Sequence, residues 1–100
     1  GMANSEARAS VMKLAPDDNV AVALKPLSAG EGIFLDGGTL TADRDIAIGH
    51  KLAARAIAKG EAILKYNCPI GIATCDIRAG AYVHTHNVKS GYLPTYVLPE

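Results

Sequence analysis

The sequence contains no tryptophan, a single phenylalanine and four tyrosines among its 100 residues. A hydrophobic core must therefore be built from Ala, Val, Ile and Leu, and a single domain of ordinary size is expected. A core of small aliphatic side chains leaves little room to enclose a substrate completely.

Net charge and long apolar runs are absent as well. Ten Lys and Arg residues balance ten Asp and Glu residues, and basic residues do not cluster, which argues against nucleic acid or an anionic membrane as a partner. No apolar run approaches the ~20 residues that span a bilayer, and no secretory signal is recognisable. We therefore expect a cytoplasmic protein that binds neither nucleic acid nor membrane.

Cysteine is scarce, with only Cys68 and Cys75 in the string CPIGIATC. Their spacing matches neither a CxxC motif nor a zinc finger. Two reduced, partly buried thiols are expected in a cytosolic chain. A disulfide would form only if a hairpin brought the two residues together.

The two ends of the chain differ from its middle. Gly1 before Met2 is typical of a cleavage scar from recombinant expression, and residues 1–18 are predicted to form a frayed N-terminus. Residues 19–100 are predicted to form one domain. Its last eleven residues contain two prolines, which exclude long regular structure, yet they are rich in apolar side chains. This apolar C-terminal tail is expected to lie on the domain or on a partner.

One short pattern recurs four times along the chain. An apolar residue is followed by two variable residues, a glycine, one further residue and a strand-like run, as in LSAGEGI, IAIGHKL, IAKGEAI and IRAGAYV. The glycines are Gly30, Gly49, Gly60 and Gly80. Glycine adopts the positive φ of a tight turn at no steric cost. Four such turns predict many short strands rather than long helices.

Short apolar runs bounded by Gly and Pro mark the predicted strands, at 20–24, 32–36, 51–54, 61–66, 70–74 and 82–88. The Ala-rich stretch 50–64 could by propensity form a helix of about ten residues. Gly60 interrupts this stretch and the turn pattern passes through it, so strands are favoured. The sequence predicts a mainly β domain with one or two short helical turns.

Several strings of the central chain resemble a known family when taken in order. They are GHK at 49–51, IAKGE at 57–61, KYNCPIGIA at 65–73 and AGAYVHTHN at 79–87. Together they resemble the small N-terminal SAF-type domain of altronate and galactarate dehydratases, over residues 21–88. The resemblance implies a β-clip fold, in which short strands fold twice on themselves. It also implies a much larger catalytic partner, either fused or separate, as for the α subunit of sulfolactate sulfo-lyase.

The string YVHTHN holds the candidate catalytic residues, His84 and His86. Residues i and i+2 of a strand share a face, ~6.5–7 Å apart, so both imidazoles would lie beside Tyr82. Such a pair can ligate a divalent ion or serve as acid and base, whereas in isolation it would be expected only to hydrogen-bond at a polar edge. The resemblance favours a role for His84 and His86 in catalysis and as metal ligands, in a metal site that is incomplete without a partner.

Three further residues are candidates for substrate binding. His50 and Lys51 follow the turn at Gly49, and the fold is expected to bring His50 near the histidine pair. Lys51 would bind a substrate carboxylate, although a loop lysine is more often a solvated charge. Asn87 would either orient a substrate hydroxyl or cap a turn. Other charged residues, including Asp43 and Arg44, are expected on solvated faces or as turn caps.

The chemistry that the resemblance implies is elimination from a sugar acid or hydroxyacid. Loss of the proton beside the carboxylate needs electrostatic stabilisation, typically by a divalent metal, with Fe²⁺ implied by the resemblance. The leaving hydroxyl needs a general acid, which imidazole supplies near neutral pH. Water would leave to give a 2-keto-3-deoxy acid, or sulfite would leave from sulfolactate.

The resemblance implies the small subunit of a lyase. Three histidines without a third metal ligand predict that this subunit is inactive alone and shares its site with a large subunit. Two alternatives stay open, namely a non-catalytic SAF-type carbohydrate-binding module and an assembly domain. The apolar tail favours subunit contact over a free binding module. A homo-oligomer is also compatible with the sequence.

Overall fold

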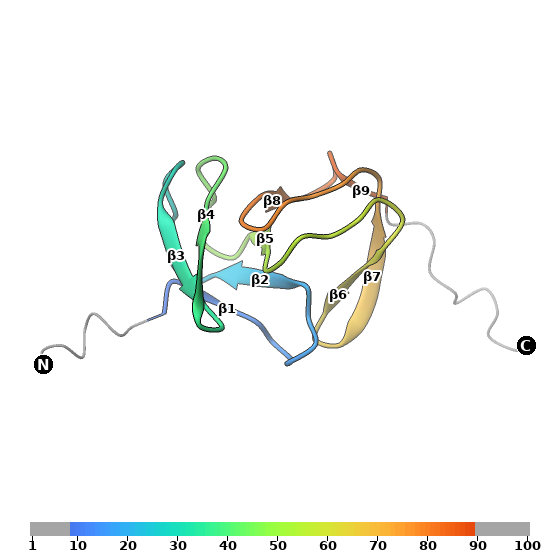
Figure 1. Ribbon diagram of the computed structural model, residues 1–100, viewed down its shortest axis with the longest axis horizontal. Coiled ribbons are helices and arrows are strands. Elements are labelled where there is room, and N and C mark those ends of the chain that lie inside the picture. Colours follow the sequence, from blue (N-terminus) through green and yellow to red (C-terminus); the bar gives the residue numbers. More distant parts are fainter. Residues whose placement is uncertain (1–8, 90–100) are drawn as a thin grey trace, which may run out of the picture.

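The computed structural model describes residues 9–89, which form nine short strands joined by turns and contain no helix (Figure 1). The prediction of a mainly β domain is confirmed. The Ala-rich stretch carries strands instead of the helical turns that its propensity allowed. The strands are β1 (Val11–Met12), β2 (Val20–Ala23), β3 (Gly32–Leu35), β4 (Gly38–Thr41), β5 (Lys51–Ala53), β6 (Ala62–Lys65), β7 (Cys68–Ala73), β8 (Tyr82–Val83) and β9 (Val88–Lys89).

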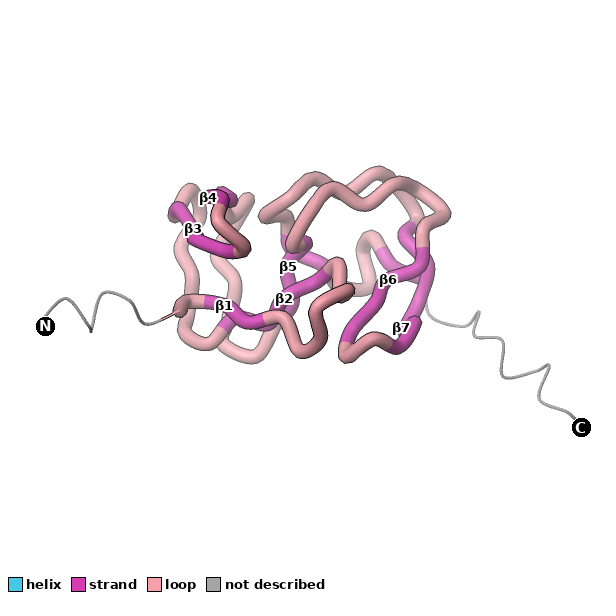
Figure 2. The backbone as a smooth tube through the Cα atoms, turned by 60° about the horizontal axis from the view of Figure 1, so that its bottom comes forward, coloured by secondary structure: helices cyan, strands magenta, loops and turns pink. Residues whose placement is uncertain are grey.

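The strands form three small antiparallel sheets. The central sheet has the order β1-β2-β5-β8, β3 and β4 form a hairpin, and the third sheet has the order β6-β7-β9. The hairpin and the third sheet lie on opposite sides of the central sheet (Figure 1). Figure 2 shows how much of the chain between the strands is turn and loop. Within the described residues no helix could cross a membrane.

Each face of the central sheet packs on its own hydrophobic cluster. Because successive residues of a strand point to opposite faces, Ala21 and Leu52 join a first cluster with Ile33 of the hairpin. Val20 and Ala53 join a second cluster with Ile63 of the third sheet. The central sheet therefore belongs to both cores.

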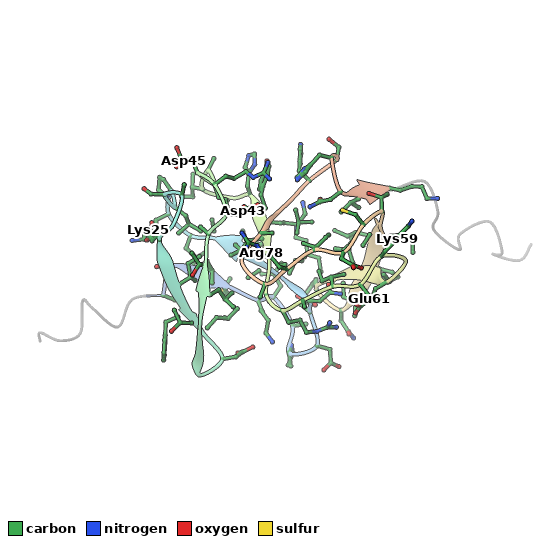
Figure 3. All side chains as sticks on the ribbon, turned by 45° about the horizontal axis from the view of Figure 1, so that its top comes forward. Lys25, Asp43, Asp45, Lys59, Glu61 and Arg78 are labelled. Carbon is green, nitrogen blue, oxygen red and sulfur yellow. The ribbon has the colours of Figure 1, made fainter. Side chains whose placement is uncertain are left out.

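The four glycine turns occur as two matched pairs. Backbone bridges join Leu27 to Ile46 in the first half and Ile57 to Ile77 in the second. All four turn glycines have positive φ, between 84° and 91°, as the pattern predicts. Figure 3 labels Lys25 and Asp45 from the first pair at one end of the molecule, and Lys59 and Glu61 from the second pair at the other.

The predicted strand 82–88 is wrong. β8 ends at Val83, residues 84–87 form a bend and turn, and β9 begins at Val88. The Asn87 side chain causes the break, since its Oδ1 accepts from the His84 backbone N–H at 3.0 Å and its Nδ2 donates to the Tyr82 carbonyl at 2.8 Å. A side-chain amide that binds nearby backbone groups replaces the strand ladder at this point.

The N-terminal segment 1–18 that was expected to be frayed is described only from residue 9 onward, and this described part is ordered. β1 pairs with β2, and Asp18 is only 3% exposed. The Asp18 carboxylate accepts four backbone N–H groups, two from its own segment and two from the turn at Tyr66 and Asn67. The predicted apolar tail at 90–100 lies outside the described residues.

Two smaller expectations also need correction. The sequence pattern missed β4, which pairs with β3 through all four of its residues. Cys68 and Cys75 are free, as expected, but both are exposed rather than partly buried.

Candidate functional site

Tyr82 is the centre of an aromatic cluster at one edge of the central sheet. It lies on β8 opposite Leu52 of β5, and His50 precedes Leu52 by two residues, so His50 reaches the same face. His50 Nδ1 is 2.7 Å from the Tyr82 hydroxyl. The two rings are stacked, with centroids 5.8 Å apart and an interplanar angle of 17°. A histidine and a tyrosine from distant parts of the chain are thus hydrogen-bonded.

The turn after β8 adds the other two histidines. The rings of His84 and His86 each stack against Tyr82 with a centroid distance of 5.6 Å. His50 also approaches His84, at 6.0 Å between centroids, which confirms that the fold brings His50 near this member of the pair. All three histidines of the chain therefore contact or neighbour one tyrosine, and all three are exposed.

A cation and a carboxylate complete the surroundings of Tyr82. The Arg44 guanidinium carbon lies 5.6 Å from the Tyr82 ring centroid, within the range of a cation–π contact. Arg44 is paired with Asp43 at 3.1 Å, and Asp43 Oδ1 accepts from the Tyr82 backbone N–H at 2.9 Å. Figure 3 labels Asp43 near the middle of the molecule. Asp43 and Arg44 thus fix the backbone and the ring of Tyr82.

The ionisation of Asp43 fits this role. Burial raises the pKa of its carboxyl, but the Tyr82 N–H and the Arg44 charge more than offset that effect and hold the pKa below its usual value. Asp43 is therefore a carboxylate at neutral pH and keeps both contacts.

The turn that carries His84 and His86 separates two hollows of the surface. His84 and Thr85 line one of them together with Lys51. His86 and Asn87 line the other together with Arg44 and other residues. The two histidines thus reach a common tyrosine but open onto different sides of the turn.

The residues expected to bind substrate lie in three different settings. His50 belongs to the aromatic cluster. Lys51, the next residue, points to the opposite face of β5, because it pairs across the sheet with Val83 of the second cluster. Asn87 is buried and its side-chain amide is bonded to the backbone of the turn. The structure thus brings His50 to the histidine pair and separates it from Lys51.

A metal ion does not fit the described residues alone. Within residues 9–89, no group of three or more His, Cys, Asp or Glu side chains could hold an ion. Zinc sites, for comparison, use three or four protein ligands. His50 Nδ1 is moreover engaged by the Tyr82 hydroxyl. Any ion bound by His84 and His86 would need most of its ligands from outside this part of the chain.

The sequence does not predict the role of Arg44 and Asp43 beside Tyr82, since it indicates solvated faces or turn caps for both residues. Their local sequence, ADRD, carries no signal of an aromatic partner nearly forty positions away. The sequence places Tyr82 on the face of the histidine pair but does not indicate a role for it. Its position two residues before His84 was the only available signal.

Comparison with known proteins gives one matching family model, that of the altronate/galactarate dehydratase SAF domain, over residues 9–91. Altronate dehydratase of Escherichia coli (strain K12) is 49% identical over 73 residues, which cover 73% of this chain and 15% of that protein. Altronate dehydratase of Bacillus subtilis (strain 168) is 38% identical over 81 residues, 16% of its length. The chain thus spans only a small part of these dehydratases.

Two alpha subunits of sulfolactate sulfo-lyase match over most of their length. The (2R)-sulfolactate sulfo-lyase subunit alpha of Chromohalobacter salexigens is 40% identical over 83 residues, covering 74% of this chain and 86% of that subunit. The corresponding subunit of Paracoccus pantotrophus is 47% identical over 51 residues, 76% of its length. Similar sequences therefore occur both as a piece of a long enzyme and as a short subunit.

Proposed function

Because the chain belongs to the altronate/galactarate dehydratase SAF domain family, we propose that it is the small subunit or domain of a hydroxyacid lyase. It would share its site with a larger catalytic portion. The reaction would be loss of water from a sugar acid to give a 2-keto-3-deoxy acid, or loss of sulfite from sulfolactate. The observation that carries the proposal is the gathering of all three histidines around Tyr82.

The proposed chemistry uses the two histidines of the turn as acid and base. Imidazole changes charge near neutral pH, so it can accept the proton beside the carboxylate or donate one to a leaving hydroxyl. In the sulfite reaction the leaving group needs less protonation. The hydroxyl of Tyr82 and the ring of His50 position this side of the site. His84 and His86 are exposed, so a partner surface must cover them to exclude water.

Substrate binding is assigned to the remaining residues by what each can reach. His50 is exposed beside Tyr82 and would contact a substrate hydroxyl. Lys51 would bind the substrate carboxylate from the other side of the turn formed by residues 84–87. Asn87 would act by shaping the turn, because its amide is already bonded to the backbone. A divalent ion, Fe²⁺ by resemblance, would be held mainly by the large portion.

The test measures rescue of a large catalytic portion by the small one. Wild-type chain, His84→Ala, His86→Ala and the control Thr39→Ala are titrated into the large partner, and 2-keto acid formation is followed. Each histidine variant is expected to lower kcat/KM by about 10²–10⁴-fold, the usual contribution of an acid or base. Thr39→Ala, at an exposed position of the β3–β4 hairpin that lines neither hollow, is expected to rescue like wild type.

Assembly is measured in parallel by size-exclusion chromatography, because exposed histidines contribute little to folding or docking. If both histidine variants rescue fully, the chain is an assembly or carbohydrate-binding module and the histidines are bystanders. Turnover by the isolated chain would show that the site is complete without a larger portion, which would also contradict the proposal.

A further inference from the structure

Lys51 occupies an unusual place at the edge of the second hydrophobic cluster. It pairs across the central sheet with Val83 of β8 and with Val22 of β2. Residues opposite one another in a sheet point to the same face, and Val83 is only 1% exposed in the second cluster. The Lys51 side chain is therefore partly buried beside apolar groups, away from His50 and Tyr82.

A cleft opens beside this lysine, and we call it the Lys51 cleft. Its walls come from strands β5 to β9 and the turn between β8 and β9. Its residues are Lys51, Ile63, Ile70, Val83, His84, Thr85 and Val88. Four of the seven are aliphatic. The polar groups are one ammonium, one imidazole and one hydroxyl, and no carboxylate lines the cleft.

A second cation strengthens the positive potential of the cleft. Lys65 lies two residues beyond Ile63 on β6, hence on the same face of the strand. Burial lowers the pKa of the Lys51 ammonium, and the nearby charge of Lys65 lowers it further. The ion pairs among the described residues involve Lys13, Lys25, Arg44 and Arg55, and neither Lys51 nor Lys65 takes part in one.

An unpaired ammonium that is partly withdrawn from water is unfavourable, and an anion placed beside it removes that cost. The aliphatic walls of the cleft would accept a short carbon chain but offer no partners to a row of hydroxyls. These two properties define the complementary ligand as a carboxylate on a short, largely apolar stem.

We propose that the Lys51 cleft binds such a carboxylate, with Lys51 Nζ donating to one oxygen and with Thr85 and His84 at the mouth of the cleft. The natural source would be the acid end of the substrate or an acidic side chain of the large portion. Only this choice of source rests on the proposed function, because carboxylate binding is a property of the isolated chain.

The experiment is a titration of the isolated chain, followed by the NMR methyl signals of Ile63, Ile70, Val83 and Val88. The probes are propanoate, the 2-hydroxy acid lactate and the neutral control propanamide. Saturable shifts with the two carboxylates, and none with propanamide, are expected. Lys51→Met should weaken propanoate binding about tenfold or more, as expected for loss of one charge-assisted hydrogen bond. Lys65→Met should weaken it less.

Lys59→Met is the matched control, because Lys59 is an exposed lysine of the glycine turn at the end of the molecule (Figure 3) and does not line the cleft. Unchanged binding is expected for this variant. The proposal is overturned if no probe gives a saturable shift, or if Lys51→Met binds propanoate as wild type does. In that case the lysine stem merely covers the apolar wall.

A third arm separates the two sources of the carboxylate. A capped peptide with one glutamate between two leucines stands for the side chain of a partner, and lactate stands for a hydroxyacid substrate. Tighter binding of lactate than of the peptide assigns the cleft to the substrate, and the reverse assigns it to the large portion. Loss of binding in Lys51→Met together with full rescue by both His84→Ala and His86→Ala would uphold the cleft while refuting the proposed function.

Discussion

The two halves of the molecule, residues 23–52 and 53–83, use the same turn construction and yet carry different surfaces. In the first half Glu31 Oε1 accepts from the Ser28 N–H at 2.8 Å, and in the second Glu61 Oε1 accepts from the Ala58 N–H at 2.9 Å. A second carboxylate joins the paired turn in each half. Asp45 accepts from the Ala29 N–H, and Asp76 accepts from the Lys59 N–H, each at 2.9 Å.

The halves differ at the residue after the last glycine turn. His50 follows Gly49 and is exposed, whereas Ala81 follows Gly80 and is buried. The next residue is Lys51 in the first half and Tyr82 in the second. The matched turns build the frame, and His50 and Tyr82 of the candidate site occupy positions at which the halves diverge.

The surroundings of these two glycines predict the largest difference in stability. Gly80 is buried at φ 91°, and a Cβ atom there would overlap the Thr41 carbonyl oxygen and lie 2.9 Å from its carbon. A Cβ at Gly49, with φ 86°, would meet nothing within 4 Å. Gly80→Ala is expected to lower the free energy of unfolding by about 4 kcal/mol or more. Gly49→Ala should cost only the backbone strain, about 1–2 kcal/mol.

Urea unfolding followed by circular dichroism measures both losses. If Gly80→Ala does not fold, Gly49→Ala still tests the comparison, because it must fold and retain most of its stability. Equal losses in the two variants would show that the close approach to Thr41 is unimportant.

The hairpin turns of the two halves predict the next largest difference. Asp18 Oδ1 and Oδ2 accept from Asn67 and Tyr66 at 2.7 and 2.8 Å, which fixes the second turn. In the first half, the exposed Asp36 only pairs with Lys13. Asp18→Asn is expected to lower the free energy of unfolding by about 2–3 kcal/mol, since an amide cannot accept all four bonds. Asp36→Asn should change it by less than about 1 kcal/mol.

The dependence of stability on pH gives a second test of the role of Asp18. Burial raises the pKa of Asp18, but its four N–H donors outweigh burial and hold the pKa below the ordinary value of 3.8. The ionised Asp18 therefore adds its full contribution to the free energy of unfolding above pH 3.8. This contribution is lost as the pH falls through the lower pKa of the folded state. Unfolding curves between neutral pH and acid should show a smaller loss of stability in Asp18→Asn. If the free energy of unfolding of Asp18→Asn fell with acid as steeply as that of the wild type, Asp18 would not be the source of this pH dependence.

The smallest effect is expected where the halves agree. Glu31→Gln and Glu61→Gln each weaken one turn bond and one exposed ion pair, with Lys25 at 3.4 Å and with Arg55 at 3.1 Å. The pKa of each glutamate is held below its usual value, mainly by the backbone N–H that it accepts. Small and equal decreases in Tm are expected in both variants. A clear inequality would mean that the two turns are not equivalent.

Much of the frame could be predicted from the sequence because it depends on local chemistry. The four turn glycines mark positions where the backbone needs a positive φ, which glycine adopts without strain. The alternation of side chains along a strand places Leu52 and Ala53 on opposite faces. The prediction at 82–88 was wrong because the Asn87 side chain competes with the strand ladder, which β propensity does not describe.

The candidate site could be predicted only in part. The approach of His50 to His84 followed from resemblance and is seen in the structure. The separation of His50 from Lys51 depends on the alternation of side chains along a strand. The sequence of 50–64 is compatible with either a strand or a helix, so it does not determine on which face each residue lies. The contact of Arg44 with Tyr82 depends on how distant loops meet, for which a single sequence holds no local pattern.

The sharing of the central sheet between both cores has a consequence for cooperativity. Tandem repeats with separate cores can open one at a time. Here β2 and β5 contribute residues to both clusters. If one half opened, the face of the central sheet that packs on that half would be exposed to water. The amide protons of β2 and β5 should therefore exchange with solvent only when the whole domain unfolds. A duplicated architecture of this kind melts as one unit.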